Sequence, residues 1–217
     1  MNKLFSNFLL LLFFGITFNV FSQETINQFD LAGKRTGVWK KYYHNKRIRY
    51  EGTFKAGKEV GIFKFYSETS SEHPIIIKNY KNNSEVSEVK FYTVKGVLLS
   101  EGKMKRKDRI GKWIYYHEDG KTMMSEENYE NGLLNGEVKT YYKSGKLTEE
   151  LHYKNGKLNG SLKRYSSEGV LLDDVIYKDD KLHGPAKYFN VEGKLIYSGN
   201  YENDEKVGKW EYFNNEE

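Results

Sequence analysis

Hydrophobic and polar residues alternate along most of this chain, in short runs separated by glycine-containing turns. In the run from Gly136 to Tyr141 the side chains switch type at almost every step, and Leu147 to Tyr153 resumes the alternation after a turn. Side chains of a β-strand point to the two faces of a sheet in turn, so a period of two predicts strands. Turn signals at Ser144-Gly145 and Asn155-Gly156 join these strands, so the pattern predicts β-hairpins.

The hairpin that starts at Gly136 recurs along the chain. With this glycine as position 0, successive units follow one another at spacings of 24, 26, 24, 25, 24, 24 and 24 residues. A constant period of this length marks a repeat architecture. The predicted fold is therefore all-β, an elongated single-layer antiparallel meander of about seven and a half hairpin repeats. The units begin at Gly37, Gly61, Ser87, Gly111, Gly136, Gly160, Gly184 and Gly208.

Charge sets the register of the two strands in each hairpin. If the first turn has two residues, the position numbers of two residues that face each other across the hairpin add up to 17. Lysine at position 3 then lies opposite an acid at position 14. Each such cross-strand pair contributes roughly 0.2–1 kcal/mol. The same register sets position 0 opposite an aromatic residue at position 17, which predicts that a ring covers the glycine. The charge pairs are Lys40–Glu51, Lys90–Glu101, Lys139–Glu150 and Lys163–Asp174.

The parity of the positions divides the side chains between two faces. Positions 2, 11, 15 and 17 are apolar and form the predicted packing face. The other face collects the lysine of position 3, the acid of position 14 and an aromatic residue at position 5. In this register position 5 lies opposite position 12, which is Arg49, Leu99, Thr148, Leu172 or Ile196. In the unit that starts at Gly136, the packing face consists of Val138, Leu147, Leu151 and Tyr153.

Residues 1–22 differ from the repeats. A basic start, an apolar run from Leu4 to Phe18 and a small residue at Ser22 are typical of a secretory signal peptide cleaved before Gln23. A membrane anchor is the weaker interpretation, because the run is shorter than the ~20 apolar residues that span a bilayer. The predicted organisation is a signal peptide at 1–22, a lead-in segment at 23–36 and repeats at 37–217. The mature protein is then secreted or periplasmic and has no transmembrane segment.

Composition sharpens this picture. The chain of 217 residues has no cysteine, so neither a disulfide nor a lipidated cysteine stabilises or anchors it. Aromatic residues make up 16% of the chain and hydrophobic residues only 38%. Many rings and few aliphatic side chains suit a thin sheet stabilised by ring contacts better than a thick globular core.

No spacing of residues indicates catalytic chemistry. The five histidines fall at different positions of the unit and never at metal-ligand spacing. Neighbouring carboxylates such as Glu149-Glu150 point to opposite faces of a strand and cannot act as a pair. We therefore expect no enzyme activity, no cofactor and no metal, with scattered catalytic groups as the alternative. The net charge of +5 is mild, and no nucleic-acid-binding motif is present, so nucleic acid is not an expected partner.

The aromatic column at position 5 is the candidate binding site, because all eight units carry a ring there. Two interpretations remain open: a structural ladder of rings packed across the sheet, and a stripe that contacts a partner. A protein partner is favoured, and the neighbouring lysines also suit an anionic lipid or glycan. The candidate stripe comprises Tyr42, Tyr66, Tyr92, Tyr116, Tyr141, Tyr165, Phe189 and Phe213, with Lys139, Lys163 and Lys187 beside it.

The stretch from Tyr50 to Gly61 resembles a MORN repeat, whose pattern is Y-E-G-x-F-x-x-G-x-x-x-G. Leu151 to Gly160 resembles the bacterial MORN-variant repeat, and the resemblance extends from Gly37 to Phe213. It implies a twisted antiparallel sheet that serves as a binding or scaffold module for protein or lipid partners. Bacterial chains of this variant are often labelled antitoxins, so the neutralisation of a partner toxin is an alternative function.

Overall fold

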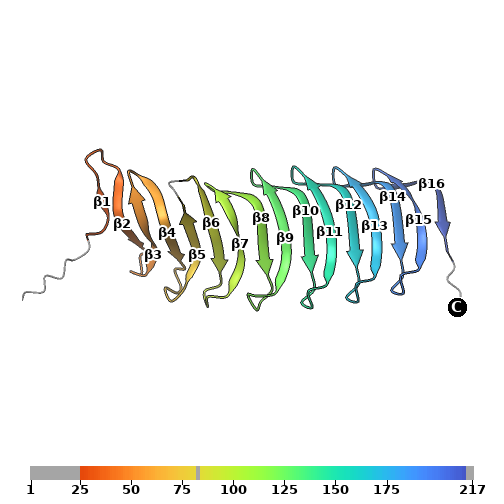
Figure 1. The fold of residues 1–217 in the computed structure, drawn as a ribbon, viewed down its shortest axis with the longest axis horizontal. Coiled ribbons are helices and arrows are strands. Elements are labelled where there is room, and N and C mark those ends of the chain that lie inside the picture. Colours follow the sequence, from red (N-terminus) through yellow and green to blue (C-terminus); the bar gives the residue numbers. More distant parts are fainter. Residues whose placement is uncertain (1–24, 82–83, 214–217) are drawn as a thin grey trace, which may run out of the picture.

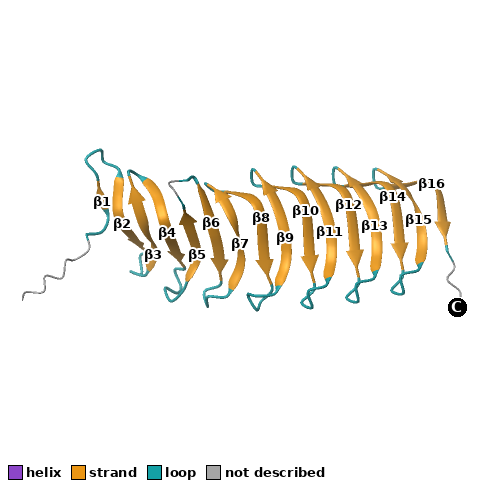
Figure 2. Ribbon diagram, viewed as in Figure 1, coloured by secondary structure: helices purple, strands orange, loops and turns teal. Residues whose placement is uncertain are grey.

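The computed structural model describes residues 25–81 and 84–213, so the predicted signal peptide lies outside the described residues. The described residues form sixteen β-strands and no helix. Each strand pairs antiparallel with the next one along the chain, which gives one open sheet in simple meander order (Figures 1 and 2). The predicted single-layer antiparallel meander is confirmed.

Each repeat contributes two strands, and the long axis of the molecule runs across them (Figure 1). Part of the lead-in segment also enters the sheet, because β1 pairs with the beginning of β2. The first eight strands are β1 (Gln28–Phe29), β2 (Arg35–Tyr42), β3 (Ile48–Lys55), β4 (Lys58–Tyr66), β5 (Pro74–Tyr80), β6 (Val86–Tyr92), β7 (Leu98–Lys105) and β8 (Asp108–Tyr116). The remaining strands are β9 (Met123–Glu130), β10 (Leu133–Tyr141), β11 (Leu147–Lys154), β12 (Lys157–Tyr165), β13 (Leu171–Lys178), β14 (Lys181–Phe189), β15 (Leu195–Glu202) and β16 (Glu205–Tyr212).

The first turn of each hairpin is longer than predicted. In the β10–β11 hairpin the backbone N–H of Gly145 donates to the carbonyl of Tyr142, and the N–H of Tyr142 donates to the carbonyl of Lys146, both at 2.8 Å. Three residues therefore form the turn. Pairing skips Thr148 on β11, and this bulge restores the predicted register beyond it. The four predicted charge pairs all face each other across the strands.

Because of the bulge, the predicted assignment of side chains to the two faces of the sheet is wrong at position 11. Tyr141 lies opposite Leu147 and not opposite Thr148, and position 5 faces position 11 in the equivalent hairpins. A slip of one residue moves a side chain to the other face of a sheet. Leu147 and its equivalents therefore lie beside the aromatic column, and not on the packing face as predicted. The skipped residues are those that we expected opposite the rings, namely Arg49, Leu99, Thr148, Leu172 and Ile196.

The glycine at position 0 has a different role from the predicted one. Gly160 does face Tyr177, yet no atom of that tyrosine lies within 4 Å of the place where a Cβ would be. The φ angle of Gly160 is +125°, and the pairing of β11 with β12 shifts register around it. Glycine is needed here because L side chains rarely adopt this backbone conformation. The prediction that a ring covers these glycines is wrong.

The core lies on the packing face and consists mainly of positions 2 and 15, with Phe54 at position 17 also buried. At position 2, Phe63 and Val89 are each 1% exposed and Trp113 is 0% exposed. The ring of Phe63 covers Gly52, and the ring of Trp113 covers Gly102, so the ring-over-glycine contact occurs at position 15. Such burial in a single layer requires curved strands, and Figure 1 draws many of them as arcs.

Residue sizes at these two positions compensate each other between adjacent repeats. A glycine at position 15 precedes a large ring, as in Gly199 and Trp210. Leu151 pairs with a residue of equal size, Leu162, and Val175 pairs with the small Ala186. In three of these pairs a glycine at position 15 thus makes room for a large ring at position 2.

Candidate binding surface

The position-5 rings and the position-11 side chains form one continuous row across the sheet. Tyr141 ends β10 and faces Leu147, and Tyr165 ends β12 and faces Leu171. Rings and mainly aliphatic side chains therefore alternate from strand to strand. We call this row the apolar band. It comprises the eight predicted rings, Tyr42, Tyr66, Tyr92, Tyr116, Tyr141, Tyr165, Phe189 and Phe213, and the residues that face them, Ile48, Pro74, Leu98, Met123, Leu147, Leu171 and Leu195.

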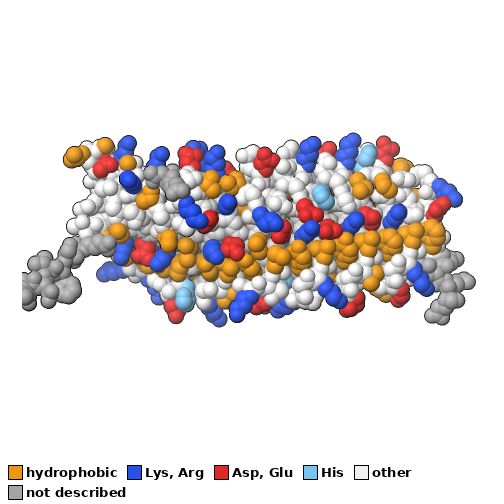
Figure 3. Space-filling model, in the orientation of Figure 1, with side chains coloured by type: hydrophobic (Ala, Val, Ile, Leu, Met, Phe, Trp, Pro, Cys, Tyr) orange, Lys and Arg blue, Asp and Glu red, His pale blue; other side chains and the backbone are white. Residues whose placement is uncertain are grey.

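A band of hydrophobic side chains crosses the molecule along its long axis in Figure 3, and charged side chains flank it on both sides. The band lies at the level where β10, β12 and β14 end in Figure 1. These are the strand ends that carry Tyr141, Tyr165 and Phe189. The predicted column of rings is therefore one half of a wider apolar surface, whose other half the sequence pattern had assigned to the packing face.

Exposure of the rings varies along the band. Tyr66 is 9% exposed, the terminal rings Tyr42 and Phe213 are 50% and 40% exposed, and the other five are half-buried. Among the described residues, the ring–ring contacts join no two members of the column. The rings are separated by the intervening strands, so their neighbours in the band are the position-11 side chains. A half-exposed ring beside an aliphatic side chain leaves apolar surface available on this face.

Three of the tyrosines are held in place by the acid of the preceding repeat. Each hydroxyl donates a hydrogen bond to the position-14 carboxylate. The same carboxylate also forms an ion pair with lysine at position 3. The hydroxyl–carboxylate distances are 2.9 Å for Tyr66–Glu51, 2.5 Å for Tyr116–Glu101 and 3.0 Å for Tyr165–Glu150. The ammonium–carboxylate distances are 3.7 Å for Lys40–Glu51, 3.8 Å for Lys64–Glu51, 2.8 Å for Lys90–Glu101 and 3.5 Å for Lys139–Glu150.

Burial and hydrogen bonding fix the protonation states of these groups. Burial, followed by the hydrogen bond to Glu150, raises the pKa of Tyr165 to about 12. Burial and the bond to Glu51 raise the pKa of Tyr66 to the same value. The ammonium of Lys90 is the main cause of a lowered pKa at Glu101. At neutral pH these tyrosine hydroxyls therefore keep their protons and donate them, which orients the three rings.

The backbone under the band is also tied to the next repeat. The hydroxyl of Tyr43 donates to the carbonyl of Tyr66 at 2.9 Å, and the hydroxyl of Tyr142 donates to the carbonyl of Tyr165 at 3.0 Å. Both donors directly follow a position-5 ring in the sequence. At these two places, neighbouring repeats are joined under the band by a side-chain hydrogen bond as well as by the sheet.

The three candidate lysines differ in their surroundings. Lys139 lies 3.0 Å from Glu137 and 3.5 Å from Glu150, and its hydrogen bond to Glu137 is the main cause of its raised pKa. Lys163 lies between Glu150 and Asp174 on the neighbouring strands, and Lys187 lies between Asp174 and Ser198. Neither lysine forms an ion pair within the described part of the chain. Among the position-3 lysines of the described residues, these two alone have no carboxylate within ion-pair distance.

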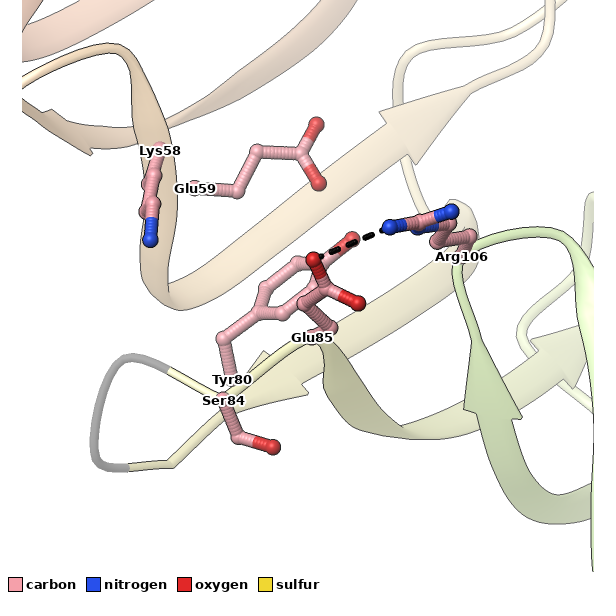
Figure 4. Close-up of a pocket in the computed structure, with 6 residues that line it drawn as sticks. All are labelled: Lys58, Glu59, Tyr80, Ser84, Glu85 and Arg106. Atoms are coloured by element: carbon pink, nitrogen blue, oxygen red, sulfur yellow. Dashed lines mark hydrogen bonds and ion pairs between the residues drawn. The ribbon is translucent and has the colours of Figure 1, made fainter.

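The surface also has a pocket of about 190 Å³ where the regular repeat is interrupted, near the β5–β6 connection (Figure 4). Arg106 and Glu85 form an ion pair of 3.2 Å at this pocket, and burial with a hydrogen bond to Glu59 raises the pKa of Tyr80. None of this is an arrangement of nucleophile and base. In residues 25–81 and 84–213, no three histidine, aspartate or glutamate side chains are grouped to hold a metal.

The segments that match a protein family have the same spacing from the position-0 glycine as one another. Residues 35–56, 134–155 and 182–203 match the MORN repeat variant. Each match begins two residues before a position-0 glycine and covers a complete hairpin: β2–β3, β10–β11 or β14–β15.

Three hairpins of the chain are thus similar to the MORN repeat variant.

MORN repeats are commonly binding or scaffold modules for proteins or membrane lipids, and they are generally not enzymes. No curated protein matches the chain. Within the part of the chain that the structure describes, no helix has the length and apolar character needed to cross a membrane.

Proposed function

We propose that the protein is an exported, non-enzymatic binding module that recognises a protein partner through the apolar band. The observation that carries this proposal is the continuous row of mostly partly exposed rings and aliphatic side chains along one face of the sheet (Figure 3). Aromatic anchors supply much of the binding energy at protein interfaces. Tyr66, Tyr116 and Tyr165 are already fixed by their acids, so binding them costs little conformational entropy.

The charge beside the band favours a protein over an anionic polymer. Lys40, Lys64, Lys90 and Lys139 each have a carboxylate within 4 Å, so most of the positive field is compensated. A rim of paired charges around an apolar centre is the usual composition of a protein–protein interface. A toxin neutralised by this protein would be one such partner.

A specific observation supports a second candidate, an anionic glycan or lipid. Lys163 and Lys187 stand beside the band without an ion pair in the described residues, and they would attract negative charge. If this candidate is right, Lys163→Gln with Lys187→Gln abolishes binding to vesicles containing phosphatidylglycerol. If the protein-partner proposal is right, the same two changes leave the captured protein bound.

Export is part of the proposal and rests on the pattern of residues 1–22. The apolar run and Ser22 predict a mature protein that begins at Gln23. Intact mass and N-terminal sequencing of the protein purified from its natural cells test this. A start at Gln23 in the envelope or medium supports export, whereas a retained Met1 in the cytosolic fraction contradicts it.

The partner is identified by affinity capture from envelope and extracellular fractions, with the natural protein as bait. Leu147→Asn with Leu171→Asn serves as the matched bait, since both changes place a polar amide within the band. We expect the genuine partner to elute from the natural bait and to be depleted from the variant bait. A protein recovered equally from both baits binds elsewhere and contradicts the role of the band.

A further inference from the structure

The two edges of the sheet differ in how far other parts of the chain cover them. At the N-terminal edge, β1 covers the beginning of β2, the side-chain carbonyl of Asn27 accepts the N–H of Lys40 at 2.9 Å, and Phe29 packs edge-on against Trp39. At the other edge, β16 pairs with β15, and no strand of the described residues pairs with its outer side. The backbone of an uncovered edge strand is a template for pairing with another chain.

The charges of β16 depart from those of the other repeats. Position 3 is lysine in six of the eight units, but it is Glu211 in the last one, and Lys209 precedes it on the same face. The two side chains lie 3.1 Å apart, and Trp210 between them points to the packing face. An antiparallel copy of β16 with Trp210 opposite itself sets Lys209 against Glu211 twice, which is a self-complementary arrangement.

We propose that two copies of the chain pair through β16, antiparallel and centred on Trp210, and so form one continuous sheet. Of the other registers that keep the faces aligned, the one centred on Val207 also sets opposite charges together, Glu205 against Lys209, but it leaves Phe213 without a facing side chain. Two further registers are unfavourable in charge. Centring on Gly208 sets Glu205 against Glu211, and centring on Lys209 sets this lysine against itself. Like charges directly opposite each other destabilise a strand pair.

The same register completes the apolar band. In the preceding hairpins the position-5 ring faces a position-11 side chain, but no described strand follows β16, and Phe213 is 40% exposed. Counting back from Trp210 brings Val207 of the second copy toward Phe213 on the face of the band, beyond the register shift at Gly208, where φ is +66°. On the packing face, the 65% exposed Tyr212 lies opposite Gly208 of the second copy. One register therefore satisfies the charges, the terminal ring and the backbone edge.

This inference does not depend on the identity of the binding partner. Sedimentation of the full chain over a range of concentrations tests it. We expect a dimer, and we expect Lys209→Glu or Glu211→Lys alone to raise its dissociation constant roughly tenfold or more, because each sets like charges opposite each other. The double variant Lys209→Glu with Glu211→Lys restores the opposite signs and should recover the dimer. Lys95→Glu, in an exposed turn, changes the net charge equally and is the control.

Several results would overturn the proposal. These are a monomer at every concentration, single variants that dimerise like the natural chain, a double variant that does not recover, or a mass that grows without limit through head-to-tail assembly. Melting curves show whether each variant is folded. If a single variant does not fold, cross-linking decides instead, since the chain contains no cysteine. A mixture of Lys209→Cys and Glu211→Cys chains should form disulfide-linked pairs faster than either chain alone, and equal rates would contradict the register.

Discussion

The indole ring of Trp113 fills the space that a side chain at Gly102 would need. Its nearest atom lies 2.4 Å from the place where a Cβ would be, a separation that real Cβ atoms do not show. The indole N–H donates to the carbonyl of Lys103 at 3.0 Å, and the guanidinium of Arg109 lies 4.8 Å from the ring centre. A glycine in one repeat thus allows a fully buried ring in the next.

This contact predicts coupling between the two residues. Gly102→Val should destabilise the protein by roughly 1–3 kcal/mol through overpacking, and Trp113→Ala by roughly 3–5 kcal/mol through the cavity it leaves. Combined, they reproduce the natural pair Val175 and Ala186, so the double variant should lose at least about 1 kcal/mol less than the sum. Urea denaturation measures all three variants.

A matched control separates direct coupling from a general loss of stability. Gly102→Val combined with Trp210→Ala disturbs two clusters that are several strands apart, so these losses should be additive. If the stability losses of Gly102→Val and Trp113→Ala also add up in the double variant, the match in size between position 15 and position 2 does not contribute to stability.

Glycines at position 0 should differ in their tolerance of asparagine. Gly111 has φ of +62° with no atom within 4 Å of a Cβ, whereas Gly160 has φ of +125° with the Cβ of His152 at 3.0 Å. Asparagine adopts the left-handed helical conformation near +60° more readily than most residues. Gly111→Asn should therefore cost under about 1 kcal/mol, and Gly160→Asn roughly 1–3 kcal/mol. Equal losses in urea melts would mean that the backbone angles do not decide these positions.

The tyrosine–acid contacts predict a loss of stability in alkali. Burial and the bonded carboxylates raise the pKa of Tyr66, Tyr116 and Tyr165 from the ordinary 10 to about 12 in the folded chain. The folded state then holds these protons more tightly than the unfolded state. Their contribution is complete below pH 10 and disappears as the pH rises through 12.

The test compares the natural protein with a variant in which these three tyrosines are phenylalanine. Near pH 7 the variant should be less stable, by roughly 0.5–1.5 kcal/mol for each lost hydrogen bond. Between pH 10 and 12 the natural protein should lose more stability than the variant, so their melting temperatures converge. If the melting temperatures of the two proteins fall in parallel over this pH range, deprotonation of these hydroxyls does not affect stability.

The repeat and the strand register could be predicted because Lys40–Glu51 and its equivalents fix the sum of facing positions. The sum of two facing position numbers cannot reveal the length of the turn. A three-residue turn followed by the bulge at Thr148 gives the same sum beyond the bulge as a two-residue turn without one. The faces of Leu147 and Leu171 were therefore misassigned. A usable signal was present: Glu168-Gly169 and Glu192-Gly193 lack the asparagine that usually accompanies a two-residue hairpin turn.

Half of the candidate site followed from the sequence. Tyr141 and Phe189 were recognised because a ring recurs at position 5, whereas Leu147 and Leu195 were missed because their face depends on the bulge. The acid contacts of Tyr165 and its equivalents join different repeats, so the register of one hairpin does not reveal them. The predicted export signal lies outside the described residues and stays a prediction.

The most direct test of the proposed function is the affinity of the captured protein for a band variant. Tyr141→Leu, Tyr165→Leu and Phe189→Leu together keep apolar bulk but remove three ring faces. Tyr188→Leu is the matched control, since it changes the ring next to Phe189 on the opposite face, where Tyr188 stacks on Tyr197. We predict that calorimetry gives a dissociation constant raised at least about tenfold for the triple variant, or roughly 1.4 kcal/mol, with a small shift in melting temperature and little change in affinity for the control. Unchanged affinity of the folded triple variant would contradict binding through the apolar band.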